Sequence, residues 1–221
     1  MPQIDTQDTS AKLIKPNSAD SNTAKPARFF IAILFDEETL DVLEDAVSSL
    51  RELSSAGRFV KRENLHLTLA FLGQVERNRI DALKQVLAEA VASATSRHAC
   101  DATRKPITQL TLTGVGRFKQ HKVSTYWVGI EAVPWLVELH DKLVASLFET
   151  GFSVDRKPFK PHITVGRDIV LKEDSDNGSS FNRLQVDSLP YAKRVNSIHL
   201  MESSMQEGQL SYTSLFEQRL L

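Results

Sequence analysis

The chain is poor in the residues that mark several classes of protein. Cys100 is the only cysteine in 221 residues, so an intrachain disulfide is excluded and a cysteine-based metal site is disfavoured. A lone cysteine is typical of proteins of the reducing cytoplasm, and we expect that compartment. No apolar run approaches the roughly 20 residues that a membrane-spanning helix needs, so we expect no membrane association.

Glycine-rich phosphate loops are also missing. Gly114-Val115-Gly116 comes nearest to a dinucleotide-binding fingerprint, but the third glycine and a following helix signal are absent. The sequence contains neither a P-loop nor the serine elbow of the α/β-hydrolases. We therefore set aside the classes of enzyme that depend on those loops.

The first 27 residues differ in composition from the rest. They are rich in Ser, Thr, Asn, Asp, Lys and Pro, contain no aromatic residue, and lack the apolar stretch of a signal peptide. Such a composition buries too little apolar surface to fold. We expect residues 1–27 to be a disordered extension and residues 28–221 to form one domain of two pseudo-symmetric lobes.

The remaining composition is that of an ordinary globular protein, but its basic residues are unevenly placed. The chain is 41% hydrophobic and 25% charged, with a net charge of −1. Local basic groups suit an anionic ligand even when the total charge is near zero. Three such groups occur: Arg58, Lys61 and Arg62; Arg117, Lys119, His121 and Lys122; and Arg156, Lys157, Lys160 and Arg167.

Hydrophobic periodicity predicts alternating strands and helices in both halves of the chain. Apolar runs predict strands at 28–34, 65–72, 110–113, 126–130, 161–166, 195–201 and 211–216, and a polar loop at 172–187. Residues stepping by three and four predict helices that contain Leu40–Leu50 and Ile80–Ala90. A third helix is expected to begin at Pro134 and to carry Leu136, Leu139, Leu143 and Leu147 on one face. We expect the first helix to end at Gly57 and the third at Gly151. The repeated order of strand, helix and strand indicates an old duplication with two similar lobes.

The most informative pattern is a His-x-Thr triplet that occurs twice, 96 residues apart. Alternate residues of a strand share a face, so each histidine is expected to project together with its threonine. The two segments are Leu65-His66-Leu67-Thr68-Leu69 and Pro161-His162-Ile163-Thr164-Val165.

This pattern suits metal-free acid–base chemistry at a phosphate. Histidine exchanges protons near neutral pH, and in-line displacement at phosphorus needs a base on one side and an acid on the other. His66 and His162 would supply them, Thr68 and Thr164 would donate hydrogen bonds to phosphate oxygens, and Arg167 would neutralise charge. Buried structural histidines are the plain alternative. A metal site is disfavoured because His98, His121, His140 and His199 show no ligand spacing with the pair.

The motifs resemble the two signatures of the 2H phosphoesterase superfamily, and within it the RNA 2′,3′-cyclic phosphodiesterases, historically called 2′-5′ RNA ligases. The resemblance spans residues 28–221 and is carried by His66-Leu67-Thr68-Leu69-Ala70-Phe71-Leu72-Gly73 and Pro161-His162-Ile163-Thr164-Val165-Gly166-Arg167. Three further stretches agree: Arg28–Ile33, Gly114–Phe118 and Leu200–Ser203.

The resemblance implies an α+β fold with two antiparallel sheets around a central cleft and helices outside. It implies metal-independent hydrolysis of RNA 2′,3′-cyclic phosphate ends to 2′-phosphates, with 2′-5′ ligation as the reverse reaction. His66 would be the acid that protonates the leaving 3′ oxygen and His162 the base that activates water, although the residues alone allow the reverse. We expect no metal or other cofactor and a monomer without an obligate protein partner.

Other readings stay open at the level of sequence. If the substrate is RNA, it could include tRNA fragments. The substrate could instead be a small cyclic nucleotide or a 2′-5′ oligoadenylate. In a third alternative, the protein is an RNA-binding module with vestigial catalysis. Phe59-Val60 stands where family members often carry a tryptophan. Phe118 could stack on a base, as aromatic residues of single-strand binders do, whereas core packing is favoured for Trp127.

Overall fold

The computed structural model describes residues 25–97, 108–155, 157–172, 184 and 186–220. Its helices are α1 (Glu37–Leu53), α2 (Ile80–Arg97) and α3 (Pro134–Glu149), with short 3-10 turns η1 (Arg62–Asn64) and η2 (Arg77–Arg79). Its strands are β1 (Ala27–Ile33), β2 (Ser54–Phe59), β3 (Leu67–Val75), β4 (Gln109–Gln120), β5 (Val123–Ile130), β6 (His162–Leu171), β7 (Tyr191–Arg194), β8 (Ser197–Gln206) and β9 (Gln209–Arg219).

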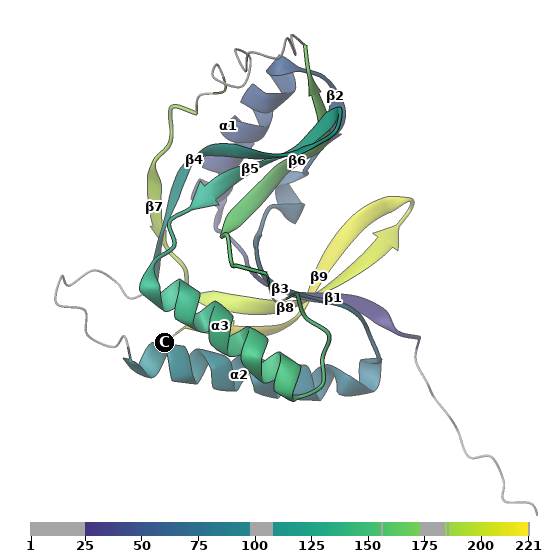
Figure 1. Ribbon diagram of the computed structural model, residues 1–221, viewed down its shortest axis with the longest axis vertical. Coiled ribbons are helices and arrows are strands. Elements are labelled where there is room, and N and C mark those ends of the chain that lie inside the picture. Colours follow the sequence, from purple (N-terminus) through teal and green to yellow (C-terminus); the bar gives the residue numbers. More distant parts are fainter. Residues whose placement is uncertain (1–24, 98–107, 156, 173–183, 185, 221) are drawn as a thin grey trace, which may run out of the picture.

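The strands form two antiparallel sheets, as the family resemblance implied. The first sheet has the order β3-β1-β8-β9 and the second has the order β2-β6-β5-β4-β7. Helices α2 and α3 pack together beneath the first sheet, and α1 packs against β2 and β6 of the second (Figure 1). The expected α+β fold with helices on the outside is confirmed.

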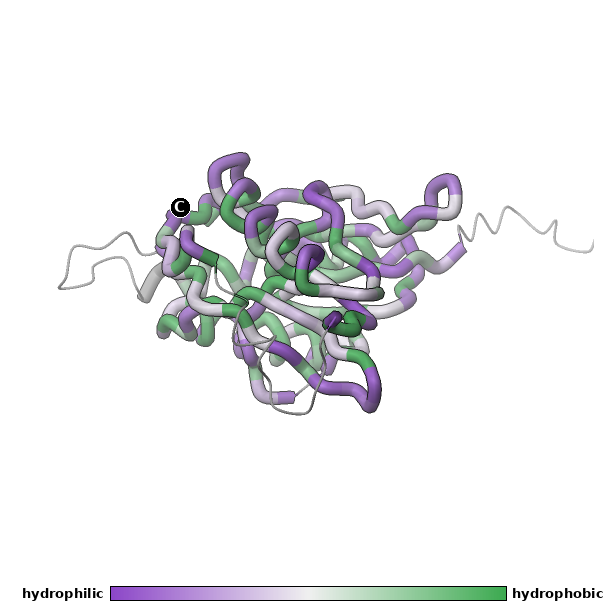
Figure 2. Tube along the Cα trace, turned by 90° about the horizontal axis from the view of Figure 1, so that it is seen from above, coloured by the Kyte–Doolittle hydropathy of each residue, from purple (hydrophilic) through white to green (hydrophobic). Residues whose placement is uncertain are grey.

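Strand β1 of the first sheet is apolar and buried on both of its faces. Phe29, Ile31 and Ile33 belong to the large hydrophobic core, whereas the alternate residues Phe30 and Ala32 form a small separate cluster with Met201, Leu34 and Tyr212. A strand that is apolar on both faces is buried on both. In Figure 2 the hydrophilic segments lie mainly at turns on the periphery of the trace.

The helices begin and end close to the predicted signals. Asp36 caps α1 by accepting from the Thr39 backbone N–H at 3.1 Å, and Glu37 and Glu38 follow in the first turn, where acids are favoured. Pro134 opens α3, and Gly151 follows its end with a φ of +78°.

The lobes are not simply the two halves of the chain. Strands β8 and β9 from the C-terminal end complete the first sheet, and β2 from the N-terminal half forms an edge of the second. Gly57, expected to end α1, lies inside β2 with a φ of +147°, and a Cβ there would lie 2.3 Å from Ile169 Cδ1. The glycine is needed for close approach of β2 to β6.

Two expectations concern segments that are largely outside the described residues. Residues 1–24 are not described, so the disordered extension at 1–27 and the domain limits stay predictions. Of the polar loop expected at 172–187, residues 173–183 and 185 are likewise outside the described part.

Candidate active site

A cavity of about 870 Å³ lies between the two sheets and brings the sequence-predicted residues together. Its lining includes all four motif side chains. His66 directly precedes β3 and Thr68 lies on it, whereas His162 and Thr164 lie on β6. Sites of this size hold ligands well beyond a single phosphate. The predicted residues that share the lining are His66, Thr68, Phe118, His162, Thr164 and Arg167.

His66 is held in place by a backbone carbonyl two residues earlier and by two aromatic rings. The residue directly precedes β3, and its Nδ1 lies 2.7 Å from the carbonyl oxygen of Asn64. The rings of Phe30 and Tyr212 pack on the imidazole, with centroids 4.9 and 5.2 Å away. Because a carbonyl only accepts, Nδ1 carries a proton and Nε2 is the atom available for proton exchange.

His162 repeats this arrangement on the other sheet. It begins β6, and its Nδ1 lies 2.7 Å from the carbonyl oxygen of Lys160. In both motifs the acceptor is therefore the carbonyl two residues earlier, and in both Nε2 is left for chemistry. Phe118 meets the His162 ring edge-on at 5.3 Å, and Trp127 lies 6.0 Å from it.

The two threonines follow the predicted strand alternation. Thr68 and Thr164 are partly exposed and line the cavity. Their neighbours Leu67 and Leu69 on β3, and Ile163 and Val165 on β6, are buried in the core. The apolar neighbours anchor each strand, so both hydroxyls are held on stiff elements with a hydrogen available for an anion.

Arg167 reaches the cavity by way of an irregularity in β6. By simple alternation with His162 and Thr164 it would point to the opposite face of the sheet. The register between β5 and β6 shifts on both sides of Tyr126, and Asp168 adopts a φ of +53°. Such bulges re-aim side chains. Arg167 joins the lining as predicted, although β6 continues to Leu171 rather than ending near it.

Burial lowers the pKa of His66 below its ordinary value of 6.5. The carbonyl of Asn64 raises it in part, and the positive charge of Arg167 lowers it further. The same two influences act in opposite directions on Tyr212, where burial raises the pKa of the phenol and Arg167 lowers it. Arg167 is thus close enough to act electrostatically on two residues of the opposite sheet.

The described lining carries more positive than negative charge. Asp155 is its one carboxylate, against five cationic side chains: Arg58, Lys61, Lys157, Lys160 and Arg167. Five of the predicted basic residues lie outside the lining: Arg62, Arg117, Lys119, His121 and Lys122. Of these, Arg62 faces α1, and Arg117 donates to the Tyr126 hydroxyl at 3.3 Å. Arg156 is outside the described residues. The electrostatics suit an anionic ligand.

Aromatic residues border the His162 side of the cavity. Lys160 Nζ lies 4.7 Å from the ring centre of Trp127 and 5.3 Å from that of Phe118. Trp127, expected in the core, is only partly buried. Its ring occupies the space above Gly116, where a Cβ would lie 2.1 Å from Trp127 Cη2. Gly116, from the segment that was set aside as a nucleotide-binding loop, therefore makes room for an aromatic ring beside the site.

Asn64 and Tyr212 belong to the site but were missed by sequence reasoning. Asn64 joins η1 to the β8–β9 hairpin, since its Nδ2 donates to the Leu210 carbonyl at 3.2 Å. The Tyr212 ring packs on His66 from β9. No local pattern marks either residue, because both contacts join segments more than 140 positions apart in the chain.

Two features are absent from the part of the chain that the structure describes. In that part, no three His, Cys, Asp or Glu side chains gather as ligands of a metal ion would. None of the described helices combines the length and the apolar composition needed to cross a bilayer.

Comparison with known proteins gives concordant matches. Residues 39–207 match the 2′-5′ RNA ligase superfamily. A Thermotoga maritima protein named RNA 2′,3′-cyclic phosphodiesterase is 35% identical over 143 residues, which are 63% of this chain and 69% of the relative. The Escherichia coli protein of that name is 31% identical over 161 residues, 72% of this chain and 78% of the relative. The crystal structure of E. coli LigT complexed with 3′-AMP superposes with a TM-score of 0.67 and 27% identity, covering 89% of this chain and 99% of the other.

Proposed function

Because the chain belongs to the 2′-5′ RNA ligase superfamily, we propose that it hydrolyses RNA 2′,3′-cyclic phosphate ends to 2′-phosphates without a metal ion. The single observation that carries the proposal is the pair of histidines in one cavity, each with Nδ1 bonded to the carbonyl two residues earlier. The names of the relatives described above support the same reaction.

The proposed mechanism uses residues from both sheets. Water attacks phosphorus in line with the 3′ oxygen while one imidazole takes a proton from the water. The other imidazole gives a proton to the departing 3′ oxygen, so the product carries a 2′-phosphate and a 3′-hydroxyl. Thr68, Thr164 and Arg167 stabilise the charge on the non-bridging oxygens of the transition state.

We assign the acid to His66 and the base to His162. Burial and the charge of Arg167 oppose protonation of His66 by lowering its pKa. A bound phosphate anion supplies an opposite charge that raises this pKa again. Binding of the substrate itself therefore prepares His66 as the acid.

RNA is the substrate class that best suits the cavity. A volume of about 870 Å³ and a surplus of cations extend well past the histidines, whereas a small cyclic nucleotide needs less. Phe118 is proposed to stack on a base beside the phosphate. The same residues would run the reaction in reverse as 2′-5′ ligation. We infer a monomer that needs no cofactor. We also infer a cytoplasmic location, which agrees with the single cysteine.

The direct test is product analysis with a short RNA that ends in a 2′,3′-cyclic phosphate, in buffer containing EDTA. We expect conversion to the 2′-phosphate by the wild type and loss of about 10²–10⁴ in rate for His66→Ala or His162→Ala. His199→Ala is the matched control, because His199 lies on β8 and bonds Ser197 and Ser214. Binding of the RNA without turnover would instead support a vestigial RNA-binding module.

A further inference from the structure

We propose that Arg62 is a positioning residue that joins the two lobes and fixes His66 relative to His162. The inference rests on the proposed function, since it concerns the two histidines assigned there. Arg62 sits on η1, between the end of β2 on the second sheet and the start of β3 on the first. The segment from Lys61 to Leu65 is thus one of the crossovers by which the chain passes between the lobes.

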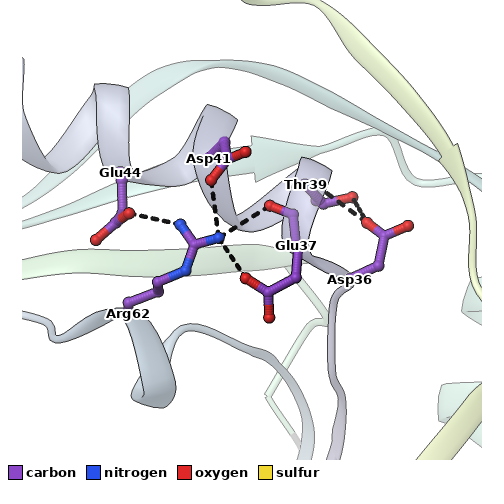
Figure 3. A network of polar contacts seen from close by, with 6 residues as sticks. All are labelled: Asp36, Glu37, Thr39, Asp41, Glu44 and Arg62. Carbon is purple, nitrogen blue, oxygen red and sulfur yellow. Dashed lines mark hydrogen bonds and ion pairs between the residues drawn. The ribbon is translucent and has the colours of Figure 1, made fainter.

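The Arg62 guanidinium is surrounded by carboxylates from one face of α1 (Figure 3). Its Nη1 lies 2.5 Å from Glu44 Oε2, and its Nη2 lies 2.7 Å from Glu37 Oε2 and 2.8 Å from Asp41 Oδ1. Nη2 also donates to the Glu37 carbonyl at 3.1 Å. The arginine side chain is 26% exposed, so a multidentate contact is held against the helix rather than in open solvent.

Both ends of this contact are tied to the catalytic histidines. On one side, α1 packs on β6, the strand that begins with His162. On the other side, η1 ends at Asn64, whose carbonyl accepts the proton of His66 Nδ1. A chain of contacts therefore runs from β6 through α1 and Arg62 to the imidazole of His66.

The residues on either side of Arg62 make other contacts, so Arg62 is the side chain that connects this segment to α1. The Val60 N–H donates to the Val165 carbonyl at 3.0 Å and ends the pairing of this segment with β6. Beyond it, Lys61 bonds Gln209 and Asn64 bonds Leu210, and both of these partners lie on β9 of the first sheet. Among the described residues of η1, Arg62 is the one whose side chain reaches back to the second lobe.

The geometry favours positioning over direct contact with RNA. Arg62 is not part of the cavity lining, although its neighbours Lys61 and Asn64 are. Its charge is also already matched by three acidic side chains. Because catalysis depends steeply on the placement of the reacting groups, loss of the contact should reduce kcat more than substrate binding.

The test compares two ways of breaking the same contact. Arg62→Gln removes the cation, and the triple variant Glu37→Gln, Asp41→Asn, Glu44→Gln removes its partners without touching η1. We expect each to lower kcat on cyclic-phosphate RNA about tenfold with KM changed less than about twofold, and their combination to be no worse than either. Arg62→Lys retains one ion pair and should recover most of the lost kcat.

Two matched controls remove ion pairs that do not reach η1. Lys193→Gln frees Asp36 and Glu38 at the start of α1, and Arg77→Gln frees Glu202 on β8. Both should keep wild-type kcat. An Arg62→Gln variant that behaves like these controls would overturn the proposal. A raised KM with unchanged kcat would also overturn it, by showing that Arg62 binds RNA directly.

A measurement that needs no turnover separates this proposal from the proposed function. NMR titration follows the ring protons of His66 in wild type, in Arg62→Gln and in the Arg77→Gln control. We expect the titration of His66 to change in Arg62→Gln and to match wild type in Arg77→Gln. Identical curves for His66 would reject the positioning role even if the enzyme proved to act on another substrate.

Discussion

At the scale of single residues, the site depends on how neighbours set the protonation of two imidazoles. A backbone carbonyl holds Nδ1 of each histidine. His66 is packed between Phe30 and Tyr212 and faces the charge of Arg167. The two motifs are therefore alike in geometry, and burial and the arginine lower the pKa of His66.

This electrostatic relation can be tested with Arg167→Gln. Removing the cation lowers the cost of protonating His66, so its pKa should rise toward 6.5. Burial still acts on the ring, so the pKa should stay below that value. NMR titration of the His66 ring in the ligand-free protein measures the change, with Arg77→Gln as a remote control. A fall in the pKa, or equal curves for both variants, would refute the assigned role of Arg167.

At the scale of elements, the sequence predicted the features that depend on residues close together in the chain. The spacing of Leu136, Leu139, Leu143 and Leu147 predicted the buried face of α3, and all four are fully buried. Strand β2 was missed because Ser54–Phe59 holds few apolar residues, and only its pairing with β6 makes it a strand. The bulge that brings Arg167 into the cavity likewise depends on how β6 pairs with β5, which the local sequence does not reveal.

The slot for Trp127 gives a prediction at this scale. In Gly116→Ala the new Cβ would lie 2.1 Å from Trp127 Cη2, so the ring must move away from its place beside Phe118 and His162. We expect a loss of about 1–3 kcal/mol in unfolding free energy together with a lower kcat. Thermal unfolding and steady-state kinetics measure both.

Gly114→Ala is the matched control for this substitution. It lies on the same strand, and a Cβ there meets no atom within 4 Å. This variant should keep wild-type stability and rate. Equal behaviour of the two alanine variants would contradict the claim that Gly116 is required by the tryptophan.

At the scale of the whole molecule, two sheets present one set of groups to each side of a shared cavity. The family resemblance carried by the repeated triplets predicted the α+β fold and the central cleft, and the triplets themselves predicted the histidines and threonines that line it. It could not predict which strands are exchanged between the lobes, since β8 and β9 join the first sheet from the far end of the chain. It also could not predict the partners of Arg62, which are decided by how α1 packs.

The pH dependence of kcat/KM tests the central claim, that one histidine acts as acid and the other as base on a single phosphate. With an RNA ending in a 2′,3′-cyclic phosphate and EDTA present, the wild type should give a bell-shaped curve. His162→Ala should lose the acidic limb and His66→Ala the alkaline limb, each with a rate lower by about 10²–10⁴. A wild-type curve without two limbs, or variants that keep both, would contradict the account.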